Sequence, residues 1–198
     1  MNRTILKRGI TLLLSLLFIF TCFTACAGAP DTPHPVLNFK GENFYYGMEI
    51  DTDELLEKFP NTQVSNNSYS INPFVSLVIR ETEGKKIVVG YFLTGYSEAT
   101  IKGFRIGDSE KKYLSNFENS GAYSSDPKTG TKVLGFFYYK DKFVPHSKYQ
   151  QYMTAARFEG TEAYEEFLNT VCVSTAMSNG TMITNMCYGD YNAIYNGK

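Results

Sequence analysis

A cysteine near the start of the chain has the surroundings of a lipid-attachment site. Cys26 follows Phe23-Thr24-Ala25, which comes after three basic residues and an apolar run from Ile10 to Phe20. A basic start, a short apolar run and small residues before a cleavage point are typical of a secretory signal peptide. In bacterial lipoproteins a cysteine directly after the small residue receives diacylglycerol on its thiol. The sequence therefore predicts that residues 1–25 are a lipoprotein signal peptide and that Cys26 is lipidated.

An uncleaved transmembrane anchor is the alternative for this segment. The apolar run is shorter than the roughly 20 residues that span a bilayer, and Thr21 and Thr24 dilute its end. Cys22 is a poorer lipid acceptor because bulky residues precede it. We therefore expect a lipid-anchored protein at the outer, extracytoplasmic face of the cell membrane.

Other groups that could do chemistry are few and scattered. His34 and His146 are the only imidazoles, and His146 has no second histidine and no cysteine nearby in the sequence, so no zinc site is expected. The acidic run at Asp51–Glu54 suits a helix N-terminus and lacks the glycine and distal glutamate of a calcium loop. Serine-hydrolase, phosphate-loop and zinc-protease motifs are missing from the sequence. We expect no cofactor, no metal and no catalytic site; a hydrolase built from scattered carboxylates is the less favoured alternative.

The charge of the chain excludes partners that need a basic surface. Residues 1–25 carry three of the 19 basic residues and none of the 20 acidic ones, so the remainder has 16 basic and 20 acidic residues, a formal charge of −4. A mildly acidic protein lacks the electrostatic footprint of nucleic-acid binding. The lipid, not a basic patch, must then hold it at the membrane. The chain also has 15 Tyr and 15 Phe and no Trp, and tyrosines combine an apolar ring with a hydrogen-bonding hydroxyl.

The segment after the lipidation site is rich in proline. Residues 26–39 contain Pro30, Pro33 and Pro35 and few side chains that a core would bury. This composition predicts a partly extended tether between lipid and domain, with His34 in solvent.

Two stretches of the chain resemble each other. Residues 47–59 and 103–117 both run from glycine through an isoleucine to an acidic or hydroxyl residue and a short helix that ends in phenylalanine. Asp51 caps the first predicted helix, with Glu54 reaching back, and Asp108 or Ser109 caps the second. Strands follow both copies: 75–81 and 86–94 as a hairpin across Glu83-Gly84, and 132–139.

The Asn179-Gly180 pair predicts another hairpin. A two-residue turn there would set Val173 opposite Met186 and place Cys172 directly opposite Cys187. A disulfide between these cysteines is then within reach in an oxidising compartment; two free thiols are the equal alternative. Between the strands, residues 140–169 read as a helical insertion with an apolar stripe that packs on the sheet.

The stretch Thr100-Ile101-Lys102-Gly103-Phe104-Arg105-Ile106-Gly107-Asp108-Ser109, followed by a helix that ends in an aromatic residue, resembles a β-lactamase-inhibitor-like repeat. The same unit is similar to the domain of small outer-membrane-assembly lipoproteins, and Ile183–Asp190 resembles the last strand of that family. The chain departs from the pattern at Asp51 and at Glu118, where the family has glycine. The resemblance implies an α+β fold of two helix-plus-antiparallel-sheet repeats packed as one domain, with repeat 1 at 40–98 and repeat 2 at 99–198.

The resemblance also implies a concave sheet surface that binds proteins without catalysis. We therefore expect a non-enzymatic protein-binding module of the cell envelope, with Tyr138, Tyr191 and Tyr195 as candidate partner contacts. A receptor for a small ligand or glycan is the alternative, because aromatic rings also stack on small ligands.

Overall fold

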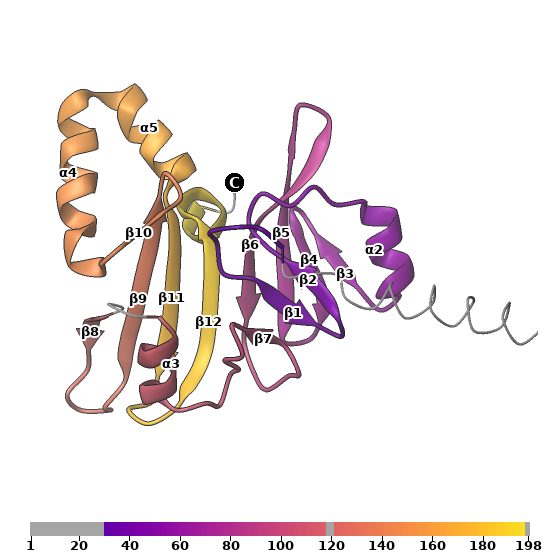
Figure 1. Cartoon of the computed structure of the whole chain (residues 1–198), viewed down its shortest axis with the longest axis horizontal. Helices are drawn as coiled ribbons and strands as arrows, with labels where there is room; N and C mark the ends of the chain where they lie inside the picture. Colours follow the sequence, from indigo (N-terminus) through magenta and orange to yellow (C-terminus); the bar gives the residue numbers. More distant parts are fainter. Residues whose placement is uncertain (1–29, 118–120, 197–198) are drawn as a thin grey trace, which may run out of the picture. The chain divides into compact units, whose positions relative to one another are not determined.

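The computed structural model describes residues 30–117 and 121–196, and the chain from Thr32 onward forms one compact unit. The predicted signal peptide and Cys26 lie outside the described residues. Among the described residues, nine strands form one antiparallel sheet in the order β10-β9-β11-β12-β6-β5-β4-β3, with β8 beside β9 (Figure 1). These strands are β3 (Gln63–Ser65), β4 (Ser68–Asn72), β5 (Val75–Thr82), β6 (Lys85–Leu93), β8 (Gly121–Ser125), β9 (Lys132–Tyr139), β10 (Lys142–Val144), β11 (Cys172–Ser178) and β12 (Ile183–Asp190).

The predicted fold class of two helix-plus-sheet repeats is wrong, because the structure is mostly β. Helices α2 (Thr52–Lys58) and α3 (Glu110–Asn116), with which the two similar stretches end, have only seven residues each. The strands that follow them join through the pairing of β6 with β12 into one large sheet. Short helices contribute little area to such a fold, and the Val-, Ile- and aromatic-rich segments dominate it.

One face of the large sheet, here called the inner face, carries the main core. Tyr91, Phe136 and Tyr188 lie on it and are at most 1% exposed. A second sheet of β1 (Leu37–Phe39), β2 (Glu42–Phe44) and β7 (Thr100–Ile101) contributes side chains to the same core, as do α2 and α3. Contacts between aromatic rings run through this core, such as Phe117 on Phe136 with centroids 4.6 Å apart.

The opposite or outer face is covered at one end by helices. The 3-10 turn η1 (His146–Lys148) leads into α4 (Tyr149–Glu159), and α5 (Thr161–Thr170) then leads into β11. Their buried side chains, among them Ala156 and Phe167, pack with Phe137 and Val173 of the sheet. Figure 1 shows the α4–α5 pair near one end of β9 and β11, and α3 near the other. Within residues 140–169 the structure thus has helices that pack on the sheet and also strand β10.

Several local predictions are confirmed. Asp51 caps α2 by accepting from the backbone N–H groups of Asp53 and Glu54, and Ser109 caps α3 by accepting from the N–H of Lys112. The β5–β6 hairpin turns at Glu83-Gly84, where both residues have positive φ. A bulge between Val78 and Ile79 shifts the pairing by one residue: Ile79 lies opposite Val88, but Val78 lies opposite Gly90. No helix among the described residues is long and apolar enough to cross a membrane.

The predicted register between β11 and β12 is wrong, and with it the predicted cysteine pair. The structure pairs Cys172 with Asp190, and Cys187 with Thr175. The two cysteines therefore point to opposite faces of the sheet, and both are free. The turn is longer than two residues: Ser178 pairs with Ile183, and the Asn179 side chain accepts from two backbone N–H groups inside the loop.

The predicted tether is also shorter than residues 26–39. Leu37 and Phe39 belong to β1 and are at most 1% exposed. His34 is 8% exposed and lies inside the folded unit, not in solvent. The apolar side chains at 37 and 39 alternate along a strand, and three prolines nearby concealed this pattern.

Candidate functional site

A cavity of a size that suits a small ligand lies on the outer face, between the sheet, the start of α4 and η2 (Asn192–Asn196). We call it the outer pocket. It has a volume of about 420 Å³, within the range of about 300–1,000 Å³ for small-molecule sites. Its lining residues are Phe136, Phe137, Tyr149, Gln150, Val173, Ser174, Thr175, Tyr191 and Tyr195.

One wall of the outer pocket is the π-helical turn η2 (Asn192–Asn196), and a buried ion pair fixes where this turn begins. Asp190, at the end of β12, is fully buried, and its carboxylate accepts two hydrogen bonds from the Arg80 guanidinium at 2.8 and 3.1 Å. The same carboxylate accepts from the backbone N–H of Ala193 at 2.7 Å. Such charge-assisted, two-point bonds are strong and directional, so they set the direction in which the chain leaves the sheet.

Two glycines allow η2 to lie directly on the sheet. Gly90 of β6 and Gly189 of β12 are paired across the strands. A Cβ on Gly189 would lie 2.4 Å from the Val89 carbonyl oxygen, and Ile194 of η2 comes within 3.2 Å of both Cβ positions. The missing side chains therefore create the depression into which Ile194 packs. This contact holds Tyr191 and Tyr195 above the sheet.

The rings around the pocket are held by one another. The ring centroids of Tyr191 and Tyr195 are 4.8 Å apart, and the Tyr195 hydroxyl is 2.6 Å from the Thr175 hydroxyl of β11. On the other side, Tyr149 at the start of α4 meets Phe137 edge to face at 5.2 Å. The wall from η2 and the wall from α4 thus both contact the strands that form the floor.

The outer pocket has no charged side chain among its lining residues. Burial is the main cause that raises the pKa of Tyr149 above its usual value, and the neighbouring Tyr191 adds to this shift. The Tyr149 hydroxyl therefore stays protonated at physiological pH. None of the lining side chains could form an ion pair with a ligand, whereas Tyr195, Thr175 and Gln150 carry hydroxyl and amide groups.

The three tyrosines selected from the sequence have different places. Tyr191 and Tyr195 lie together at the outer pocket, and Tyr195 is 50% exposed. Tyr138 is 7% exposed and packs in the core on the inner face, so it is not available to a partner. Sequence reasoning missed Tyr149, Gln150 and Thr175, because the pocket arises only when the insertion folds over β11.

A row of half-buried side chains leads away from the pocket across the outer face. Thr175 pairs with Cys187, Cys187 with Phe92, Phe92 with Ser76, and Ser76 with Ser70. We call these five residues the outer strip. All five are partly accessible to solvent, and the hydroxyls of Ser70 and Ser76 are 2.9 Å apart. The strip begins at the pocket, since Thr175 belongs to both.

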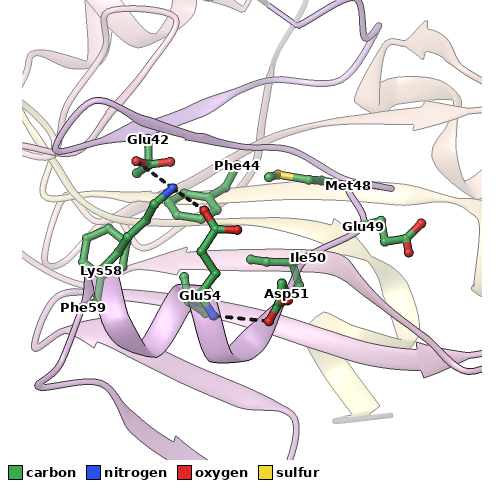
Figure 2. Close-up of a pocket in the computed structure, with 10 residues that line it drawn as sticks. Glu42, Phe44, Met48, Glu49, Ile50, Asp51, Glu54, Lys58 and Phe59 are labelled. Carbon is green, nitrogen blue, oxygen red and sulfur yellow. Dashed lines mark hydrogen bonds and ion pairs between the residues drawn. The ribbon is translucent and has the colours of Figure 1, made fainter.

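A second, smaller pocket lies beside α2 and contains several carboxylates (Figure 2). Its volume is about 110 Å³, below that of typical ligand sites. Lys58 lies between Glu42 and Glu54, with its Nζ 3.2 and 3.0 Å from their carboxylates. Glu49, at the other end of the pocket, pairs with Lys85 at 2.8 Å. Each of these carboxylates has a cation beside it, so the group docks α2 and is a poor candidate for a reactive site. Glu54 pairs with Lys58 and does not reach back as the predicted capping box.

In a third group of side chains, the His34 imidazole lies between a hydroxyl and a carboxylate. His34 Nδ1 is 2.5 Å from the Tyr188 hydroxyl, and His34 Nε2 is 3.2 Å from the Asp141 carboxylate. A carboxylate only accepts, so Nε2 carries the proton and Nδ1 accepts from Tyr188. Tyr188 is fully buried, and burial raises its pKa well above the usual value. The hydroxyl therefore cannot reach a substrate, and the group fastens the segment around His34 to the sheet.

The free cysteines are not suited to nucleophilic chemistry. Burial raises the pKa of the Cys172 thiol strongly and that of Cys187 to about 11. Thiols with such pKa values are almost entirely protonated near pH 7, and the thiolate is the reactive form. Within the described residues, no three His, Cys, Asp or Glu side chains gather in a way that could hold a metal ion.

Comparison of the chain with models of protein families, with curated proteins and with solved structures found no match. The resemblance to β-lactamase-inhibitor-like repeats therefore stays a prediction.

Proposed function

We propose that this protein is a lipid-anchored, extracytoplasmic binding protein of the cell envelope that acts without catalysis. The observation that carries the proposal is the outer pocket, an uncharged cavity in which Tyr191 and Tyr195 lie together with Tyr149. Aromatic walls with a few polar groups are typical of sites that bind ligands. The sequence around Cys26 supports the anchor, and the acidic balance of the rest of the chain argues against nucleic acid as the partner.

Two considerations support binding over catalysis. The imidazole of His34 is enclosed and its hydroxyl partner, Tyr188, has no access to solvent. The lining of the outer pocket has hydroxyl and amide groups but contains no histidine, cysteine, aspartate or glutamate, the usual general acids and bases.

A protein partner is the second candidate for what binds. The outer strip favours it, because a row of half-buried side chains beside an aromatic pocket could extend the contact across the sheet. Phe92 and Thr175 would then lie under the partner, and Tyr195 would contact its edge. A small ligand is favoured by the concave shape and the volume of the pocket.

Capture from solubilised envelopes tests the binding role. The full chain is compared with a Tyr191→Ala/Tyr195→Ala variant, and with Tyr96→Ala as the matched control, since Tyr96 is 70% exposed and lies outside the pocket. We expect the wild type and the control to retain the same saturable partner or ligand, and the double variant to lose it. Equal retention by all three proteins would contradict a role for the outer pocket.

The anchor is tested separately. Cys26→Ala is expected to abolish incorporation of labelled fatty acid and to move the protein out of the membrane fraction. A lipidated, membrane-bound Cys26→Ala protein would contradict the assignment of the attachment site.

A further inference from the structure

We propose that the outer pocket binds one ring of an uncharged carbohydrate chain and that the outer strip holds the next rings. This inference rests on the proposed binding function and narrows it to a ligand class. The first reason is charge: none of the lining residues is ionic. A charged ligand would lose part of its hydration without gaining an ionic partner among these residues, which is unfavourable.

The second reason is the chemistry of the walls. A sugar ring has faces of C–H groups and an edge of hydroxyls, so it needs both apolar surface and groups that donate and accept hydrogen bonds. Tyr191 and Tyr195 supply aromatic surface, and Tyr195 is half exposed at the mouth of the pocket. The hydroxyls of Thr175 and Tyr195 lie 2.6 Å apart, and Gln150 of α4 also lines the pocket. Each of these three groups can both donate and accept, as a sugar hydroxyl does.

The third reason is the continuation of the site. Phe92 lies two strands from Thr175 along the outer strip, with Cys187 between them. Neighbouring strands are about 4.8 Å apart, so Phe92 is about 10 Å from the pocket floor. A second aromatic side chain at this distance suits an oligosaccharide that begins in the pocket and runs across the sheet. A single small molecule confined to the pocket would not reach it.

The chain has no tryptophan, which gives a direct optical test. Tyr195→Trp places a single indole at the pocket, and Tyr96→Trp places one at an exposed position outside it. The full-length protein is held in a detergent without a sugar headgroup, and glucose, cellotriose, maltotriose, chitotriose and trigalacturonate are titrated in turn. We expect at least one neutral trisaccharide to shift the emission of Tyr195→Trp saturably and to leave that of Tyr96→Trp unchanged.

The Tyr195→Trp substitution could itself weaken binding, since Tyr195 lines the pocket. Calorimetric titration of the unsubstituted chain with the same sugars therefore measures binding independently. Tyr191→Ala is expected to weaken binding of the trisaccharide about tenfold. Phe92→Ala is expected to weaken the trisaccharide but not a monosaccharide, because only the longer ligand reaches the outer strip. Circular dichroism confirms that both variants are folded.

The outcomes separate this inference from the function on which it rests. Absence of binding by every neutral sugar, in both the optical and the calorimetric titrations, would overturn the carbohydrate assignment. Tighter binding of trigalacturonate than of the neutral trisaccharides would overturn it as well. If the capture experiment still retained a protein that the Tyr191→Ala/Tyr195→Ala variant loses, the binding function would stand and the ligand would be a protein.

Discussion

His34 shows how a single buried side chain can link stability to pH. Its ring packs near Tyr46 and Tyr138 and joins Tyr188 to Asp141. Burial lowers the pKa of His34 below its usual value of 6.5, and the nearby Asp141 carboxylate opposes this only in part. The unfolded chain therefore binds a proton more readily than the folded one.

We predict that the free energy of unfolding falls as the pH drops through 6.5 and levels off below the folded-state pKa of His34. His34→Gln should remove this part of the pH dependence, because glutamine does not titrate. Urea denaturation of the wild type and the variant at several pH values between 8 and 5 measures it. His146→Gln removes the only other histidine and serves as control; a wild-type slope in His34→Gln would contradict the prediction.

The ion pair between Arg80 and Asp190 leads to a second prediction. Arg80→Ala would leave the fully buried Asp190 carboxylate without its cation, and breaking a buried pair in this way costs about 3–5 kcal/mol. Chemical denaturation should show a loss of this size. The matched control is Lys85→Ala, whose exposed pair with Glu49 should contribute little. Similar losses of unfolding free energy in both variants would contradict the view that burial decides how much an ion pair contributes to stability.

At the scale of elements, the paired glycines decide whether η2 can pack on the sheet. Gly189→Ala would put a Cβ 2.4 Å from the Val89 carbonyl and 2.5 Å from the Gly90 Cα. Both of these are backbone atoms, so we predict that the variant is destabilised by about 1–3 kcal/mol and loses the outer pocket.

The same substitution at the paired glycine, Gly90, should cause less steric conflict and serves as the comparison. Gly90→Ala meets its nearest atom at 3.0 Å, so the loss of stability should be smaller. Hydrogen exchange of the Ala193 amide, which donates to Asp190, reports whether η2 has left the sheet. Unchanged exchange in Gly189→Ala would contradict the role given to the glycine pair.

The elements also show what the sequence could and could not predict. The bounds of β9 and the cap of α2 follow from local patterns, because strand-forming residues and a capping aspartate act on their neighbours. The register of β11 and β12 depends on a distant contact: Gly107 and Ile183 share a backbone hydrogen bond, as do Ile183 and Asp108. These bonds tie the loop after Asn179 to the start of α3. A turn dipeptide carries no information about such a contact, so the predicted register and the cysteine pair failed together.

The candidate site was predictable only in part for the same reason. Tyr191 and Tyr195 follow the last described strand, but the residues with which they line the pocket come from β9, β11 and α4. Tyr138 has the same residue type and a buried position, since it lies on the inner face of β9. Composition marks a tyrosine as suited to binding, whereas the pairing of strands decides on which face of the sheet it lies.

On the scale of the whole molecule, the two predicted repeats share one sheet. β6, within residues 40–98, pairs with β12, within residues 99–198, and β1, just before the first predicted repeat, pairs with β7 of the second. We therefore predict a single cooperative unfolding transition, with calorimetric and van't Hoff enthalpies that agree. Two separable transitions would indicate that residues 40–98 and 99–198 are independent units.

The place of β12 has a consequence for the newly made chain. β12 is the last strand that the structure describes, and it lies in the interior of the sheet, between β11 and β6. Until residues 183–190 are available, β6 and β11 each keep an unpaired edge and Tyr188 is missing from the core. Long-range pairings of this kind form late and slowly. The large sheet and its core can therefore be completed only after residues 183–190 have been synthesised, however early the strands before them are made.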